Sequence, residues 1–173
     1  MSKKLLIYGL AFGSACAAIS FVYFSAAVYK QSLFIQSIFI ISEWLLLPII
    51  AISLFFRSIK EMNPESFTMG RAVFTGFLLS IIMSAAVSLV FTYILQFKPE
   101  LIAQIIDYKN GLILIKAKQL NRTPDEIKNA LDNIKFAYNS SAQFINQIFL
   151  GASRGLFFSA IIAYIMKAKI NRD

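Results

Sequence analysis

The sequence contains no histidine and only one cysteine, Cys16, and these two scarcities exclude several kinds of chemistry. Without histidine, neither a Ser-His-Asp nor a Cys-His catalytic arrangement can form, and histidine-ligated haem and HExxH zinc sites are ruled out. A single cysteine rules out a disulfide within the chain. Because Cys16 lies between small residues in a long apolar run, we expect it to be a buried and unreactive thiol.

Motifs that hold phosphate groups are missing as well. The sequence has neither a GxxxxGK[ST] nor a GxGxxG pattern, and its long apolar runs contain no aspartate that could build an intramembrane carboxylate dyad. We therefore expect that the protein is not an enzyme and has no catalytic residues, no cofactor and no metal site. An enzyme that acts on lipid is kept as the last of three hypotheses, because such sites can lack familiar motifs.

Charged residues are also scarce, at 15% of the 173 residues, whereas hydrophobic residues make up 58%. The apolar residues come in runs, and about 20 consecutive apolar residues suffice to cross the hydrocarbon region of a bilayer. Four runs reach that length, at residues 5–29, 33–56, 72–97 and 144–166. The sequence therefore predicts an all-α polytopic membrane protein with four transmembrane helices in a single membrane domain, residues 1–173.

The first apolar run begins like a cleaved signal peptide, with two lysines, an apolar stretch and small residues around Cys16. It then continues to Tyr29, which gives about 25 residues, long enough for a retained membrane anchor. We therefore predict that this segment stays in the protein as its first transmembrane helix.

The net charge of +8 does not indicate nucleic acid, because the basic residues gather at the ends of the apolar runs. Four spans place both termini on one side of the membrane. The basic residues on that side are Lys3, Lys4, Arg57, Lys60, Arg71, Lys167, Lys169 and Arg172. The first loop on the other side offers only Lys30. The positive-inside rule then predicts that both termini are cytoplasmic.

Residues 98–143 lie between the third and fourth runs and are predicted to be extracytoplasmic, with seven basic and five acidic residues. Their pattern predicts a helical hairpin that turns at Asn121-Arg122. The second helix opens with a capping box, in which Thr123 caps, Pro124 takes the first helical position and Glu126 completes the pair. It then carries an apolar stripe formed by Ile127, Leu131, Ile134 and Tyr138. An ordinary cap over the bundle is the plainest interpretation, and a membrane-surface or partner contact is the alternative.

Small residues recur every four positions in three of the four predicted helices, where they allow helix backbones to approach closely in lipid. The first series is Gly9, Gly13 and Ala17, the second is Gly76, Ser80, Ser84 and Ser88, and the third is Gly151, Gly155, Ser159 and Ala163. We call these series the small-residue seams. They predict a compact helix bundle, and they could equally include a dimer face.

Two charges interrupt the apolar runs, Glu43 in the second and Arg154 in the fourth. Each is the eleventh residue of its run, and both runs cross from outside to inside, so the two side chains are predicted to lie at similar depth. Because an isolated charge in the bilayer is costly, we predict an intramembrane ion pair between Glu43 and Arg154. Two interpretations remain open: the pair only fixes helix neighbours, or it lines a cavity for an ion, a proton or a small polar solute.

A proline and several amides accompany Glu43. Pro48 lacks the N–H that would bond the Trp44 carbonyl, so a bend is predicted beside Glu43. Gln36 lies one heptad before Glu43, on much the same helix face. The outer end of the fourth span adds the polar residues Gln143, Asn146 and Gln147.

The four-span layout resembles a bacterial membrane-protein family catalogued as domain of unknown function 4199. Three stretches carry the resemblance: ESFTMGRAVFTG before the third run, KPELIAQII at the start of the hairpin, and GLFFSAIIAYIMKAK in the fourth run. The resemblance implies an integral protein of a bacterial inner membrane and brings no catalytic or binding residues. It implies no arginine at the position of Arg154, which would make the ion pair particular to this chain.

These features together predict a scaffold or accessory subunit of the inner membrane. It would bind a protein partner or a second copy of itself through the hairpin and the small-residue seams. The alternative is a small transporter or channel-like protein with a midplane site at Glu43 and Arg154. Transporters often contain an internal repeat of broken spans, whereas only the second span here contains proline. Both hypotheses require a lipid bilayer, and neither involves nucleic acid.

Overall fold

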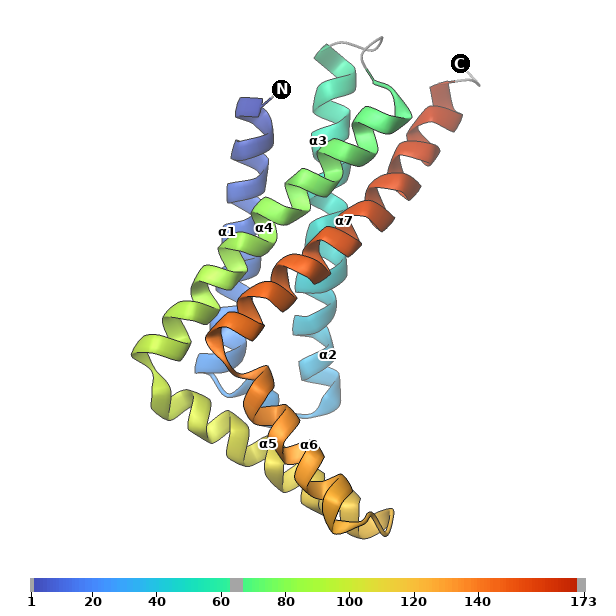
Figure 1. The fold of residues 1–173 in the computed structure, drawn as a ribbon. Coiled ribbons are helices and arrows are strands. Elements are labelled where there is room, and N and C mark those ends of the chain that lie inside the picture. The colour runs from blue at the N-terminus through green and yellow to red at the C-terminus, as the bar shows by residue number, and fades with distance from the viewer. Residues whose placement is uncertain (1, 63–66, 171–173) are drawn as a thin grey trace.

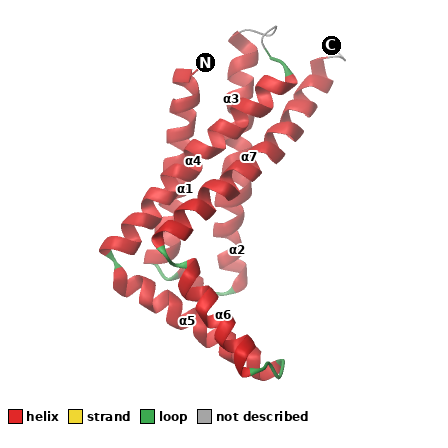
Figure 2. Cartoon of the chain, viewed as in Figure 1, coloured by secondary structure: helices red, strands yellow, loops and turns green. Residues whose placement is uncertain are grey.

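The computed structural model describes residues 2–62 and 67–170, and every regular element in them is a helix (Figure 1). Figure 2 shows the chain by secondary structure, and the described residues contain no β-strand. The helices are α1 (Ser2–Ser25), η1 (Val28–Lys30), α2 (Leu33–Ile41), η2 (Ser42–Leu46), α3 (Leu47–Met62), α4 (Met69–Phe97), α5 (Pro99–Gln119), α6 (Pro124–Ala137) and α7 (Ser140–Ile170). The all-α prediction is confirmed.

Four helical segments among the described residues are long and apolar enough to cross a membrane, as the sequence predicted. They are Lys3–Ser25, Leu33–Glu61, Met69–Phe97 and Ala142–Lys167. The second segment joins α2, η2 and α3 without a break. α1 ends before Tyr29, where the sequence placed the end of the first span. The reason is that Ala27 has a left-handed backbone conformation (φ 51°), which an α-helix does not continue through.

Figure 1 shows both labelled termini at one end of the bundle and the pair α5 and α6 at the opposite end. α4 is the central helix, because it packs extensively against both α1 and α7. The most apolar 18-residue window of α4 is 44% buried, against 28% for α1 and 22% for each of the other two spans. The outward surfaces of all four spans expose large apolar side chains, as expected of helices surrounded by lipid.

The small-residue seams lie inside the bundle, where they bring α4 close to its two neighbours. A Cβ atom on Gly13 of α1 would come 3.0 Å from the Met83 Cα atom of α4. A Cβ atom on Gly155 of α7 would come 3.1 Å from the Phe77 Cα atom of α4. Backbone atoms cannot move aside without shifting a whole helix. The seams therefore hold the chain's own helices together.

A serine hydroxyl reinforces the contact between α4 and α7. Ser159 of α7 is fully buried, and its Oγ atom lies 3.2 Å from the Val73 carbonyl oxygen of α4. The same hydroxyl also bonds to the Gly155 carbonyl of its own helix. Gly76 of α4 leaves room for Ser159, because a Cβ atom at position 76 would collide with it. This seam thus combines close packing with a hydrogen bond between helices.

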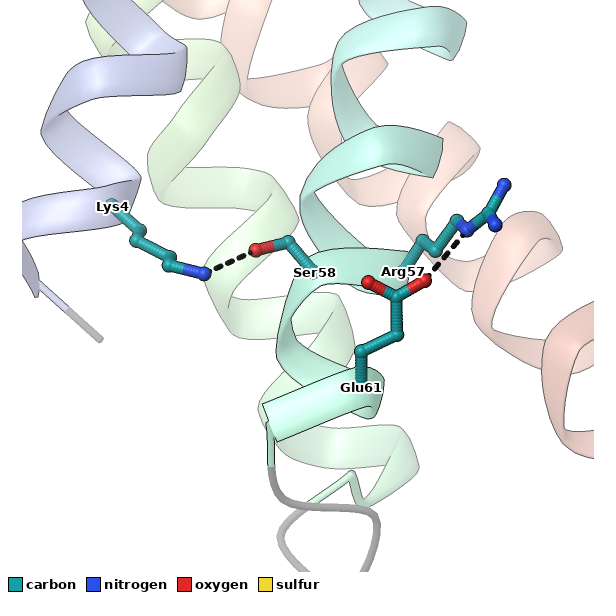
Figure 3. A network of polar contacts seen from close by, with 4 residues as sticks. All are labelled: Lys4, Arg57, Ser58 and Glu61. Carbon is teal, nitrogen blue, oxygen red and sulfur yellow. Dashed lines mark hydrogen bonds and ion pairs between the residues drawn. The ribbon is translucent and has the colours of Figure 1, made fainter.

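At the end of the bundle that carries the termini, a polar contact joins α1 to α3 (Figure 3). The Lys4 Nζ atom donates to the Ser58 Oγ atom at 2.8 Å. On α3, the Arg57 Nε atom donates to Glu61 Oε1 at 2.8 Å, one helical turn further on. The Arg57 and Glu61 side chains are 73% and 63% exposed. Because of this exposure, their pair contributes at most about 0.5 kcal/mol.

The helices α5 and α6 lie beside each other at the other end of the bundle (Figure 1). The capping box predicted at the start of α6 is confirmed. The Glu126 N–H donates to Thr123 Oγ1 at 3.4 Å, and the Thr123 N–H donates to Glu126 Oε2 at 2.9 Å. The predicted apolar stripe is half-buried, and it comprises Ile127, Leu131, Ile134 and Tyr138. Since most of the remaining surface of α6 is exposed, this stripe is the face that packs on α5.

Candidate functional site

The second span changes helical register where it carries Glu43. The segment η2 is π-helical, and the Leu47 N–H donates to the Ser42 carbonyl, five residues back instead of four. In this register the donor for the Glu43 carbonyl would be Pro48, which has no N–H. The Cys16 thiol of α1 lies 3.9 Å from that carbonyl oxygen and provides a weak donor.

The position of the missing hydrogen bond differs from the sequence-based expectation. An α-helical register would leave the Trp44 carbonyl without its donor, whereas the π register transfers the deficit to Glu43 itself. π-helical segments within α-helices are frequent at functional sites. The backbone distortion therefore indicates a role for Glu43 beyond packing.

Glu43 and Arg154 both line a small cavity between α1, the second span, α4 and α7. Its volume is about 20 Å³, which is room for about one water molecule. The Ser80 hydroxyl is buried beside it and has no hydrogen-bond partner among the described residues. The complete lining is Cys16, Glu43, Pro48, Ser80, Met83, Ser84, Val87, Gly151 and Arg154. We call this space the inner cavity.

The structure brings the two predicted charges to one cavity but not into direct contact. Within residues 2–62 and 67–170, Arg57–Glu61 is the one ion pair with an N–O distance of 4.0 Å or less. Glu43 and Arg154 are nevertheless close enough to interact electrostatically. The direct ion pair therefore stays a prediction, and the finding is that both side chains share a polar space.

Arg154 has two closer partners. Its Nε atom donates to the Leu150 carbonyl at 3.2 Å, one turn back along α7. Its guanidinium carbon lies 4.4 Å from the centre of the Trp44 ring, within the range of a cation–π contact. Such a contact contributes about 2 kcal/mol when it is desolvated. Arg154 is thus held in place by its own helix and by an aromatic face of the second span.

A larger cavity also reaches Glu43, and its lining residues lie further toward the end of the bundle that carries α5 and α6. Its volume is about 160 Å³. The lining residues are Ser20, Tyr23, Phe24, Phe39, Ile40, Glu43, Trp44, Phe91 and Gln147. A protein cavity of about 150 Å³ accommodates a benzene molecule. This space, which we call the outer cavity, is therefore large enough for a small organic molecule.

Aromatic rings form much of the wall of the outer cavity, and they contact one another. The Phe24 ring packs edge-on against Phe91, with ring centroids 4.9 Å apart, and against Tyr23, at 5.2 Å. The Tyr23 ring also lies 6.2 Å from that of Phe39. Since these residues come from α1, α2 and α4, the aromatic wall ties three spans together.

Polar atoms also reach the outer cavity, from Glu43, Ser20, Tyr23 and Gln147. The Ser20 hydroxyl is a hydrogen-bonding partner of the Glu43 carboxyl group. Tyr23 is close enough to Glu43 to interact electrostatically with it, and it interacts in the same way with Tyr108 and Tyr138. Polar groups therefore extend from the outer helix pair down to Glu43.

The turn η1 contacts α5 at the same end of the bundle. Tyr29 of this turn is buried, and its ring lies 5.6 Å from that of Tyr108. The Tyr29 hydroxyl and the Asn110 Oδ1 atom are both buried without a hydrogen-bond partner among the described residues. Burial raises the pKa of the Tyr29 hydroxyl, and Tyr138 raises it further, so this group stays protonated at neutral pH.

Two of the amides that the sequence associated with Glu43 do not join the site. The Gln36 Nε2 atom donates to the Tyr29 carbonyl at 3.1 Å and to the Gln31 carbonyl at 2.8 Å, which fastens α2 to the preceding turn. Gln143 donates to the Ala137 carbonyl near the start of α7. Gln147 is the predicted amide that lines the outer cavity.

The sequence did not single out the aromatic wall. Its members are ordinary residues of apolar runs, and nothing in their spacing separates an inward ring from one that faces lipid. The available signal was Trp44, the only tryptophan of the chain, which directly follows Glu43. Its position beside an intramembrane charge is what the structure turns into a contact with Arg154.

Comparison with known families finds a match over nearly the whole chain. The model of the family described as "Protein of unknown function (DUF4199)" matches residues 7–168, which confirms the resemblance noted in the sequence. No curated protein and no solved structure matches the chain. The matched range includes Glu43 and Arg154 but assigns neither a role.

Proposed function

The chain belongs to the DUF4199 family of proteins of unknown function, and we propose that it is a bacterial inner-membrane protein that binds a small polar solute beside Glu43. Both termini lie in the cytoplasm, and α5 and α6 form an extracytoplasmic helical hairpin. The outer cavity then opens toward the extracytoplasmic side. The protein acts as a small transporter or channel-like protein, and no step of this function requires covalent chemistry.

The observation that carries the proposal is the meeting of the two cavities at Glu43. A carboxylate that served only to hold two helices together would be packed directly against its partner. Glu43 instead shares the inner cavity with Arg154 at a distance, and an outer cavity of about 160 Å³ reaches it as well. Ionisable residues that face a cavity inside the membrane are typical of ion and solute pathways.

Thiol labelling from the extracytoplasmic side tests the proposal. The background is a Cys16→Ala variant, which has no other cysteine. Gln147→Cys then places a thiol on the wall of the outer cavity. Phe149→Cys is the matched control on the same helix, at a position where 69% of the residue is exposed on the outside of the bundle. Intact cells are treated with a charged maleimide that does not cross membranes.

We expect Gln147→Cys to be labelled and Phe149→Cys to be nearly inert, because a thiol that faces lipid stays protonated and out of reach of a charged reagent. Two unlabelled thiols would mean that water does not enter the outer cavity from outside, which contradicts the proposal. Equal labelling of both would mean that position 147 lies above the membrane rather than in a cavity, and this result also contradicts it.

A second candidate function is the binding of a protein partner or a second copy of the chain through α5 and α6. The small-residue seams cannot serve this purpose, because they are buried between α1, α4 and α7. The outer helix pair, however, exposes large apolar side chains outside the four spans: Leu112, Leu114, Ile115, Leu120 and Phe136. A photo-reactive residue at position 136 tests this function. Adducts with a protein would support it, and adducts with lipid alone would contradict it.

A further inference from the structure

Five aromatic side chains and one carboxylate converge on the outer cavity. The rings belong to Tyr23, Phe24, Phe39, Trp44 and Phe91, and the carboxylate is that of Glu43. A positive charge is attracted by a carboxylate and also by the faces of aromatic rings. None of the described residues that line this cavity is a lysine or an arginine. The cavity therefore suits a cation and disfavours an anion.

We propose that the solute is a small organic cation, an ammonium compound that places its charge beside Glu43 and its carbon atoms against the aromatic wall. This inference rests on the proposed function, because it names the class of solute bound at the same site. The cavity volume of about 160 Å³ matches a molecule of several heavy atoms.

A bare metal ion fits the same lining poorly. Calcium, for example, takes about six to eight oxygen ligands. Oxygen atoms at the outer cavity come from only four of the described side chains, those of Glu43, Ser20, Tyr23 and Gln147. The rest of the wall is apolar, and an organic cation gains from contact with it whereas a hydrated metal ion does not.

Arg154 acts as the built-in competitor of the bound cation. In the empty site Glu43 needs a counter-charge, because an isolated carboxylate inside a membrane is costly. Arg154 provides that charge from the inner cavity, within electrostatic range of Glu43 but not in direct contact with it. An ammonium group in the outer cavity takes over this role. Because two cations near one carboxylate repel each other, the solute binds against the effect of Arg154.

The position of Arg154 supports this division of the site. Its guanidinium lies 4.4 Å from the Trp44 ring centre, and its Nε atom is bonded to the Leu150 carbonyl. Both contacts keep the arginine in the inner cavity, of which it is a lining residue, and out of the outer one. The Glu43 carboxylate is thus the group that the two spaces share.

Trp44 supplies the readout for an experiment, because it lines the outer cavity and is the only tryptophan in the sequence. The full chain in lipid nanodiscs is titrated with choline and with 3,3-dimethylbutan-1-ol, the uncharged molecule of the same shape. Tryptophan emission is recorded, and calorimetry repeats each titration. We expect saturable binding of choline and at least about tenfold weaker binding of the alcohol. Equal binding of the two, or no binding of choline, would overturn the proposal.

Three variants test the roles of the charges. Glu43→Gln keeps the shape of the side chain and is expected to weaken choline binding at least about tenfold. Arg154→Gln is expected to strengthen choline binding several-fold, because the competing charge is gone. Glu61→Gln, an exposed carboxylate on α3, is the control and is expected to leave binding unchanged. If Arg154→Gln weakened choline binding as Glu43→Gln does, Arg154 would be a ligand and the proposal would be wrong.

A further variant covers the case in which a charge substitution prevents folding. Tyr23→Leu removes one aromatic face of the outer cavity and changes no formal charge. It is expected to weaken choline binding several-fold and to leave binding of the alcohol nearly unchanged. A parallel loss for both molecules would show that the ring acts only by packing and would count against a cation site.

Labelling of Gln147→Cys separates failure of this inference from failure of the proposed function. A labelled thiol that choline protects supports both. A labelled thiol, combined with equal binding of choline and the alcohol, means that a solute cavity exists but that its solute is not a cation. An unlabelled thiol means that the outer cavity is closed from outside, so the proposed function itself fails.

Discussion

The guanidinium carbon of Arg154 lies 4.4 Å from the centre of the Trp44 ring, and this contact joins α7 to the π-helical segment of the second span. Glu43, which precedes Trp44 in the chain, is within electrostatic range of the same guanidinium. One arginine therefore interacts with two successive residues of η2. A substitution at any of these positions is expected to be felt by the other two.

Substitution of the two charges should show that they are coupled. Glu43→Gln and Arg154→Leu are each expected to lower the amount of folded protein in membranes, because each leaves the other charge without its counter-charge in lipid. The double variant is expected to recover part of the loss. Size-exclusion chromatography of a fluorescent fusion in mild detergent measures the folded fraction. Losses that simply add would mean that Glu43 and Arg154 act independently.

Replacement of the proline in the second span should stabilise it. Pro48→Ala supplies an N–H where the Glu43 carbonyl lacks a backbone donor, and one such hydrogen bond contributes about 1 kcal/mol. The melting temperature in detergent is expected to rise by about 2–4 °C. Pro99→Ala is the control, because a proline in the first turn of α5 removes no helical hydrogen bond. A lower melting temperature for Pro48→Ala would mean that the π-helical segment itself is stabilising.

Glycine substitutions should have opposite effects inside and outside the bundle. Gly155→Ala places a Cβ atom 2.6 Å from the Ser80 Cβ atom and 3.1 Å from the Phe77 Cα atom, so we expect a loss of about 1–3 kcal/mol. Gly111→Ala in α5 meets no atom within 4 Å and is expected to gain about 0.5–1 kcal/mol in helix stability. Thermal unfolding in detergent measures both. Equal effects would mean that α4 and α7 are not in close contact at Gly155.

Reporter fusions test the proposed orientation. A fluorescent protein fused after residue 173 is expected to fluoresce, because both termini are proposed to be cytoplasmic. Alkaline phosphatase inserted between Asn121 and Arg122, in the turn after α5, is expected to be active, because it requires an oxidising, extracytoplasmic compartment. The reverse pattern would invert the chain and place the outer cavity on the cytoplasmic side.

The four spans and the capping box at Thr123 were predictable because each depends on residues that are close in the chain. Run length alone identifies a segment that can cross a bilayer. A cap is formed by side chains three residues apart, so Thr123 and Glu126 carry the whole signal. The end of α1 was not predictable in this way, because the apolar run continues past Ala27, whose left-handed backbone ends the helix.

The aromatic wall of the outer cavity was not predictable because a helix in lipid is apolar on every side. On α1, Phe24 lines the outer cavity whereas Phe21 is 41% exposed. On α4, Phe91 lines it whereas Phe74 is 59% exposed. The residue type is the same in each case, so only the packing of the helices decides which ring turns inward.

The candidate site was predictable in its charges but not in their contacts. Counting along the two runs places Glu43 and Arg154 at similar depth, and the structure brings both to the inner cavity. The π-helical register of η2 and the stacking of Arg154 on Trp44 depend on atoms of separate helices. No pattern within a single run encodes them.

The unequal packing of the spans has a mechanical consequence. α4 is fixed to α1 and α7 by glycine contacts, whereas the span built from α2, η2 and α3 has no small-residue seam and touches its neighbours more sparsely. The molecule thus consists of a stiff three-helix frame and one span that leans against it. Widening of the outer cavity is least costly as a tilt of this leaning span about η2, with the frame at rest.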